Sequence, residues 1–135
     1  MIPFRIEHIG VAVPDIEQAL SQYSDSLGYK LLRGPYDDLH QQARVAFIGN
    51  EAGGTQLELV APLAPGSQVE RVLAKGQGLY HICYEVPDIA EAIAHLRSQK
   101  CILISGPTPA VAYEGRPIAW LYTPSRQLTE LVEAP

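Results

Sequence analysis

The sequence predicts an α+β protein made of two tandem βαβββ modules that form a cup-shaped mixed sheet. The phrase HIGVAVPDI at residues 8–16 returns as HICYEVPDI at residues 81–89, with six of nine positions identical and a spacing of 73 residues. In both copies a strand-like run leads into the phrase and a helical pattern follows it. Strand candidates then follow each helical pattern. A repeat on this scale is typical of a duplicated structural unit.

The first module opens with the strand-like run RIEHIGVAV at residues 5–13. Side chains alternate between the two faces of a strand, so His8 points away from the face that carries Ile9 and its apolar neighbours. Asp15 is a natural N-cap, and Gly28 can end the helix that begins after it. The apolar residues between them recur at helical spacing, which predicts an amphipathic helix that covers the apolar face of the strand.

The strands that complete this module are expected at residues 29–34, 43–49 and 55–62. The breaker-rich stretches RGPYDD and NEAGG predict loops between them. A linker, residues 63–78, follows the first module, which spans residues 1–62. The linker contains SQVERVLAKGQG, which predicts a short helix and a glycine-rich turn.

The second module, residues 79–135, repeats this order. LYHICYEV is its first strand, Asp88 caps its helix, and Ile89, Ala92, Ile93 and Leu96 form one apolar helix face. Its remaining strands are expected at residues 101–106, 116–122 and 127–134, and SGPTP and YTPS predict loops. VAFI and LELV in the first module also match IAWL and TELV in the second. The duplication therefore extends to the end of each module, and residues 1–135 are predicted to form a single domain.

Two histidines and two glutamates occupy matching positions of the two copies. His8 and His81 begin the repeated phrase, whereas Glu58 and Glu130 lie in the closing strands. Strand alternation turns all four away from the helix-packed faces. A single strand histidine is more often a hydrogen-bonded core residue than a ligand, but the paired occurrence in both copies favours a common site. We expect these four residues to ligate one divalent metal ion.

Carboxylates favour hard ions and imidazoles favour transition metals, so Co, Ni, Zn, Mn and Mg all remain candidates. Four protein ligands on an octahedral ion leave two positions for water or substrate oxygens.

Composition sets the broad class of protein. Apolar residues make up 47% and charged residues 19% of the 135 residues, which is typical of a globular chain. The net charge of −5 and the lack of a basic cluster argue against nucleic acid as a partner. No apolar run reaches the ~20 residues of a membrane span, and no signal peptide is evident. Cys83 and Cys101 do not suggest a disulfide framework, so a cytoplasmic protein is expected.

The motifs EHIGVAVPDIEQAL, QLELVAPL, GLYHICYEVPDI and LTELVEA resemble, in this order, segments of the vicinal oxygen chelate superfamily, in particular its methylmalonyl-CoA epimerases and glyoxalase I members. The resemblance covers nearly the whole chain. It implies the glyoxalase fold, with His8, Glu58, His81 and Glu130 as metal ligands and a homodimer as the usual assembly.

The resemblance also implies an activity: proton transfer α to a carbonyl, perhaps of an acyl thioester, with Glu130 as the base. One departure concerns the third strand, ARVAFIG, which lacks the additional glutamate that epimerases of this superfamily can carry there. Three alternatives stay open, namely a glyoxalase I-like lyase, a resistance-type module that binds a small molecule, and an extradiol-type dioxygenase. The dioxygenase is disfavoured by Glu58 as an extra acidic ligand and by the short chain.

Overall fold

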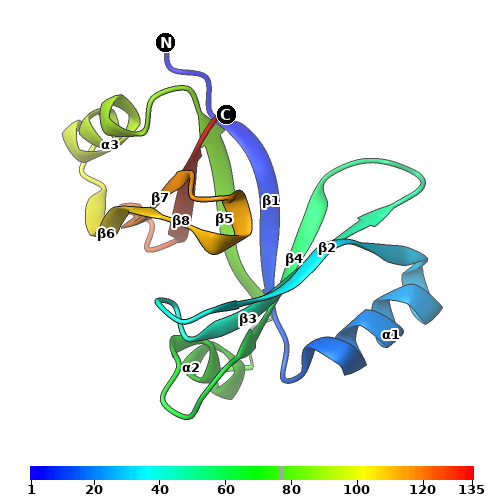
Figure 1. The fold of residues 1–135 in the computed structure, drawn as a ribbon. Coiled ribbons are helices and arrows are strands. Elements are labelled where there is room, and N and C mark those ends of the chain that lie inside the picture. The colour runs from blue at the N-terminus through cyan, green and yellow to red at the C-terminus, as the bar shows by residue number, and fades with distance from the viewer. Residues whose placement is uncertain (77) are drawn as a thin grey trace. The chain divides into compact units, whose positions relative to one another are not determined.

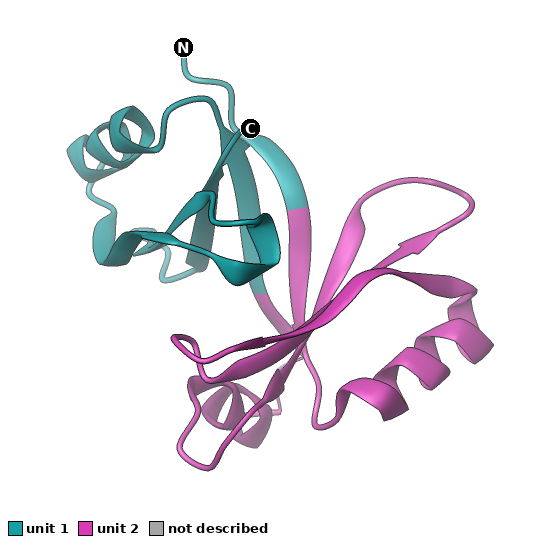
Figure 2. Ribbon diagram, viewed as in Figure 1, with its two compact units in different colours: residues 1–7, 81–135 teal, residues 8–80 magenta. Residues whose placement is uncertain are grey.

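The structure is a computed structural model that describes residues 1–76 and 78–135. Its residues fall into two compact units, residues 8–80 and residues 1–7 with 81–135, which Figure 2 colours separately. The helices and strands labelled in Figure 1 are β1 (Arg5–Ala12), α1 (Ile16–Leu27), β2 (Tyr29–Asp38), β3 (Ala43–Asn50), β4 (Gln56–Pro62), α2 (Gln68–Ala74), β5 (Leu79–Val86), α3 (Ile89–Ser98), β6 (Ile102–Pro109), the 3₁₀ helix η1 (Val111–Tyr113), β7 (Pro117–Tyr122) and β8 (Leu128–Glu133).

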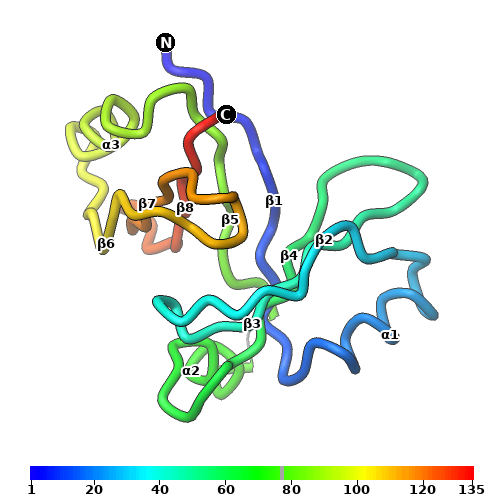
Figure 3. The backbone as a smooth tube through the Cα atoms, in the orientation of Figure 1, coloured from blue at the N-terminus to red at the C-terminus, as the bar shows by residue number. Residues whose placement is uncertain are grey.

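In the unit of residues 8–80, the strands are ordered β2-β3-β4-β1. Strand β3 is antiparallel to both β2 and β4, and β1 pairs with β4 in parallel. The backbone trace in Figure 3 follows the chain through these elements. Helix α1 buries Ile16 and Ala19 in an apolar cluster with Val11 and Leu59. The apolar face predicted for the first strand is therefore the face that packs against the helix.

Both ends of α1 follow the prediction. The backbone N–H of Gln18 donates a 2.8 Å hydrogen bond to Asp15 Oδ2, which satisfies one of the free N–H groups of the first turn. Gly28 adopts the left-handed conformation at φ 73°, and its N–H donates to the carbonyl oxygen of Ser24. Glycine adopts the left-handed conformation without a steric penalty, because it has no Cβ that could clash with the backbone.

The other unit repeats this plan with the strand order β5-β8-β7-β6. Strand β5 pairs with β8 in parallel, and β7 is antiparallel to β6 and β8. The N–H of Glu91 donates to Asp88 Oδ1 at 3.0 Å, as the N-cap prediction requires. Helix α3 packs Ile89 and Ala92 against Leu131 of β8 in the apolar cluster of this unit. The βαβββ order predicted from the repeat is thus present in both halves of the chain.

Two predicted loops are wrong. RGPYDD belongs to β2 and SGPTP to β6, so both strands are longer than the sequence suggested. The breakers are accommodated because β2 and β6 are outermost in their strand orders, where proline is tolerated. Register irregularities mark both strands, and Gly34 (φ +91°) and Gly106 (φ +97°) adopt backbone angles that other residues avoid. A breaker here bends the strand and does not end it.

The short helix predicted between the modules is α2, which Ser67 caps through a hydrogen bond from the N–H of Val69. The predicted glycine-rich turn includes Gln77, which lies outside the described residues. The module limits 1–62 and 79–135 stay a prediction. Within residues 1–76 and 78–135, no helix is both long and apolar enough to cross a membrane.

Candidate metal centre

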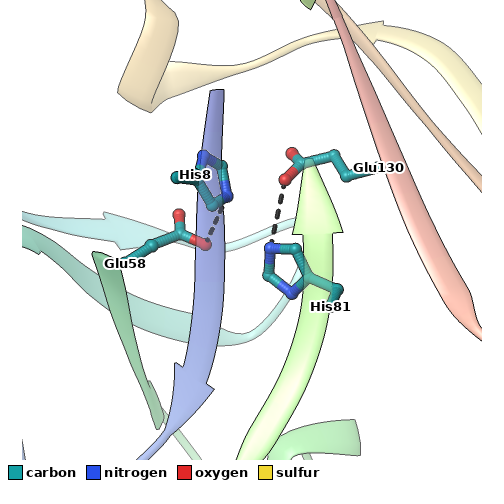
Figure 4. A group of neighbouring side chains, drawn as sticks. All are labelled: His8, Glu58, His81 and Glu130. Atoms are coloured by element: carbon teal, nitrogen blue, oxygen red, sulfur yellow. Dashed lines mark ion pairs between the residues drawn. The ribbon is translucent and has the colours of Figure 1, made fainter. Parts of the chain in front are cut away.

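In the unit of residues 8–80, β1 and β4 bring one imidazole and one carboxylate together. His8 is completely buried and Glu58 nearly so. His8 Nε2 lies 3.2 Å from Glu58 Oε1, which Figure 4 marks as an ion pair. The parallel register sets Glu58 opposite Gly10, a residue on the same face of β1 as His8. The predicted strand alternation therefore places both side chains on one face.

The second unit contains an equivalent pair. His81 on β5 and Glu130 on β8 are both buried, and His81 Nε2 lies 3.2 Å from Glu130 Oε1 (Figure 4). Here the parallel register sets Glu130 opposite Cys83, which occupies the position of Gly10 in the repeat. The same strand pairing thus produces the same contact between a histidine Nε2 and a glutamate Oε1 in both halves of the chain. The thiol of Cys83 is fully buried, as expected for a small core residue.

An aromatic ring supports each histidine, a feature that the sequence interpretation missed. Phe47 lies opposite Glu58 across β3 and β4, and its ring meets His8 edge-on with 5.4 Å between centroids. Trp120 lies opposite Glu130 across β7 and β8 and meets His81 edge-on at 4.8 Å. The signal was present in the match of VAFI with IAWL, whose aromatic residues share one position. These rings restrict the orientation of the imidazoles.

Each buried pair presents atoms of the kind that bind metal ions. A carboxylate is costly to bury unless a partner compensates its charge, and here an imidazole nitrogen is at hydrogen-bonding distance. Imidazole nitrogens and carboxylate oxygens are also the N and O ligands that divalent transition metals bind. Both pairs present these atoms from rigid strands, so the donor set fits a divalent ion well.

The chain belongs to the Glyoxalase/Bleomycin resistance protein/Dioxygenase superfamily, whose family model matches residues 7–120. This is the superfamily predicted from the repeated motifs. Among curated proteins, the chain is similar to the ethylmalonyl-CoA/methylmalonyl-CoA epimerase of Cereibacter sphaeroides, with 34% identity over 87% of both chains.

The chain is also similar to solved structures of methylmalonyl-CoA epimerases. A crystal structure of selenomethionyl methylmalonyl-CoA epimerase matches with a TM-score of 0.82 and 27% identity, over 100% of this chain and 98% of the other. A methylmalonyl-CoA epimerase in complex with methylmalonyl-CoA and NH4+ matches with a TM-score of 0.80 and 27% identity, over 97% of this chain and 94% of the other. The predicted glyoxalase fold class is therefore confirmed.

Proposed function

We propose that this protein is a metal-dependent epimerase that transfers a proton α to the carbonyl of an acyl-CoA thioester such as methylmalonyl-CoA. The observation that carries the proposal is the buried imidazole–carboxylate pair, built twice on equivalent strands. Relatives with this fold are named as epimerases of such thioesters, and one of them was solved with methylmalonyl-CoA. The epimerase interpretation is thus favoured over a lyase or a resistance-type binding module.

The proposed metal site uses both pairs. In this proposal His8, Glu58, His81 and Glu130 together are the ligands of one divalent ion. Their two carboxylates would balance the two charges of a divalent cation, and the imidazoles allow Co, Ni or Zn as well as Mn or Mg. When bound, the ion would polarise the substrate carbonyl and stabilise the negative charge that develops on its oxygen.

We assign the base to Glu130. An ordinary carboxylate, with a pKa near ~4.3, is too weak to remove an α-proton unless the resulting charge is stabilised. Glu130 is buried beside His81, with 3.2 Å between His81 Nε2 and Glu130 Oε1, and this burial shields its carboxylate from bulk water. Glu58 is assigned to ligation only. Strand β3 carries no acidic side chain, so it offers no alternative base.

Solvent exchange tests the assignment. The metal-loaded protein should incorporate deuterium from D₂O into methylmalonyl-CoA, as followed by NMR. Glu130→Gln keeps an oxygen ligand but removes the base, so exchange should slow by about 10²–10⁴-fold. Glu58→Gln should slow it less, because an amide oxygen can still ligate. The control, His40→Gln, changes an exposed histidine and should leave exchange unchanged.

Two outcomes would overturn parts of this proposal. If Glu58→Gln abolishes exchange while Glu130→Gln does not, the roles of the two glutamates are reversed. If the wild-type protein exchanges no α-proton of methylmalonyl-CoA, the epimerase function is wrong and a lyase or binding module takes its place.

We also propose that the protein is cytoplasmic, because Cys83 and Cys101 do not suggest a disulfide framework, and that it is a homodimer, as the family resemblance implies. Sedimentation at micromolar concentration should give twice the mass of the 14.7 kDa chain. A species of 14.7 kDa alone would contradict it.

A further inference from the structure

Arg33 stacks on the aromatic ring that supports His8. Its guanidinium carbon lies 3.6 Å from the centroid of Phe47, a completely buried ring. The same ring lies nearly perpendicular to the imidazole of His8, with 5.4 Å between the two centroids. One aromatic ring therefore separates a permanent cation from a proposed metal ligand. A guanidinium over the face of an aromatic ring is a cation–π contact, for which arginine is well suited.

The strand register shows which face Arg33 occupies. Residues directly opposite each other on neighbouring strands share a face of the sheet. Arg33 lies opposite Phe47, and Phe47 lies opposite Glu58. Arg33 is thus on the face that carries the His8–Glu58 pair. The strand register is irregular on both sides of Arg33, between Leu31 and Arg33 and between Arg33 and Tyr36. Bulges of this kind commonly change the direction of a side chain beside a functional site.

The second unit builds the same position with a different residue. Ser105 lies opposite Trp120 between two register irregularities, and Trp120 lies opposite Glu130. The duplicated scaffold therefore presents a cation next to one histidine–glutamate pair and a small hydroxyl next to the other. Two otherwise equivalent half-sites differ in charge at this position, which is the kind of asymmetry that an asymmetric substrate requires.

We propose that Arg33 is a specificity residue that recognises a carboxylate on the substrate, so that the site selects acyl thioesters bearing a carboxylate next to the thioester carbonyl. This inference rests on the proposed function. The charges support it: two glutamates offset a divalent ion, so a substrate carboxylate adds a negative charge that the ligand set does not compensate. The planar fork of Arg33 suits a carboxylate, which it can bind through two parallel hydrogen bonds.

Arg44 provides a matched control on the neighbouring strand. Its guanidinium donates to Glu17 at 3.0 Å and to Asp37 at 2.9 Å. The hydrogen bond that Arg44 donates to Glu17, followed by the one it donates to Asp37, raises the pKa of Arg44. Arg44 is thus held in surface ion pairs of the same unit, away from the ring that supports His8. Replacing it removes one positive charge from the protein without removing the charge that stacks on Phe47.

The test compares a ratio of affinities. Dissociation constants of racemic methylmalonyl-CoA and of propionyl-CoA, which lacks the carboxylate, would be measured by calorimetry on the metal-loaded wild type, Arg33→Gln, Arg33→Lys and Arg44→Gln. Arg33→Gln should reduce the preference for methylmalonyl-CoA by about 10- to 100-fold, since it removes a charged hydrogen-bond donor, while propionyl-CoA affinity changes little. Arg33→Lys should keep part of the preference, and Arg44→Gln all of it.

A merely structural role for Arg33 predicts a different result. Loss of packing would weaken binding of both thioesters together and leave their ratio unchanged, which would overturn the inference. A wild-type ratio near one would overturn it as well. Deuterium exchange separates this failure from failure of the proposed function: wild-type exchange with an unchanged ratio in Arg33→Gln refutes only the role of Arg33, whereas absent exchange in the wild type refutes the epimerase.

Discussion

Replacing Gly106 with alanine tests the close approach of β6 to β7, the strand that carries Trp120. An added Cβ would lie 2.6 Å from the carbonyl oxygen of Ile118 and 2.8 Å from Cα of Ala119. Both are backbone atoms of a paired strand, so they cannot rotate away as a side chain can. Overpacking of this kind costs about 1–3 kcal/mol, and the backbone angle of +97° adds about 1–2 kcal/mol for a residue with a Cβ. Together, these two costs should lower the free energy of unfolding of Gly106→Ala by about 2–5 kcal/mol.

Alanine substitutions at two other glycines separate the cost of the backbone angle from the cost of the close contacts. Gly115 has a similar angle, φ +87°, but a Cβ there would meet nothing within 4 Å. Gly115→Ala should therefore cost about 1–2 kcal/mol, the backbone contribution alone. At Gly34, φ +91°, the nearest atom would be the carbonyl oxygen of Val45 at 3.1 Å, which requires a smaller shift. The losses should increase in the order Gly115→Ala, Gly34→Ala, Gly106→Ala.

Urea unfolding at 25 °C followed by circular dichroism measures this series, provided that the slope of the transition stays constant among the variants. Equal losses for Gly106→Ala and Gly115→Ala would refute the reasoning, because the contacts with β7 would then contribute nothing. Gly34→Ala should also weaken discrimination between the two thioesters, since it displaces Arg33. A larger loss of stability in Gly34→Ala than in Gly106→Ala would contradict the link between distance and cost.

Further predictions concern the caps and the metal. Asp15→Ala should cost about 1 kcal/mol of unfolding free energy in urea, and Asp15→Asn should recover most of it, because the amide oxygen can still accept from Gln18 N–H. Calorimetric titration with Co²⁺ should show weaker binding below about pH 6, because the metal binds neutral imidazole and an ordinary histidine takes up its proton near ~6.5; affinity that rises on acidification would exclude histidine ligands. Metal at 100 times its dissociation constant should stabilise the wild type by about 2.7 kcal/mol in thermal melts, and His8→Ala should remove most of this gain.

The repeated phrase was sufficient to predict the βαβββ order, the caps at Asp15 and Asp88, and the orientation of the site residues. These features depend on local rules: a capping side chain reaches its own helix end, and alternation fixes the face of a strand residue once its neighbours are apolar. For this reason the sequence could also predict that each module supplies one histidine and one glutamate, whereas the contacts of His8 with Glu58 and of His81 with Glu130 come from the structure.

The tertiary structure decided what depends on strand pairing. Strands β2 and β6 continue through glycines and prolines for which the sequence predicted loops. They can do so because an outermost strand tolerates proline and glycine that a central strand does not. The tertiary structure also set the register that places Phe47 beside Glu58 and Arg33 beside Phe47. No local pattern encodes that register across two irregularities, since a shift of one residue moves a side chain to the other face. The sequence therefore determined which residues could form a site, and strand pairing determined which cation and which rings surround them.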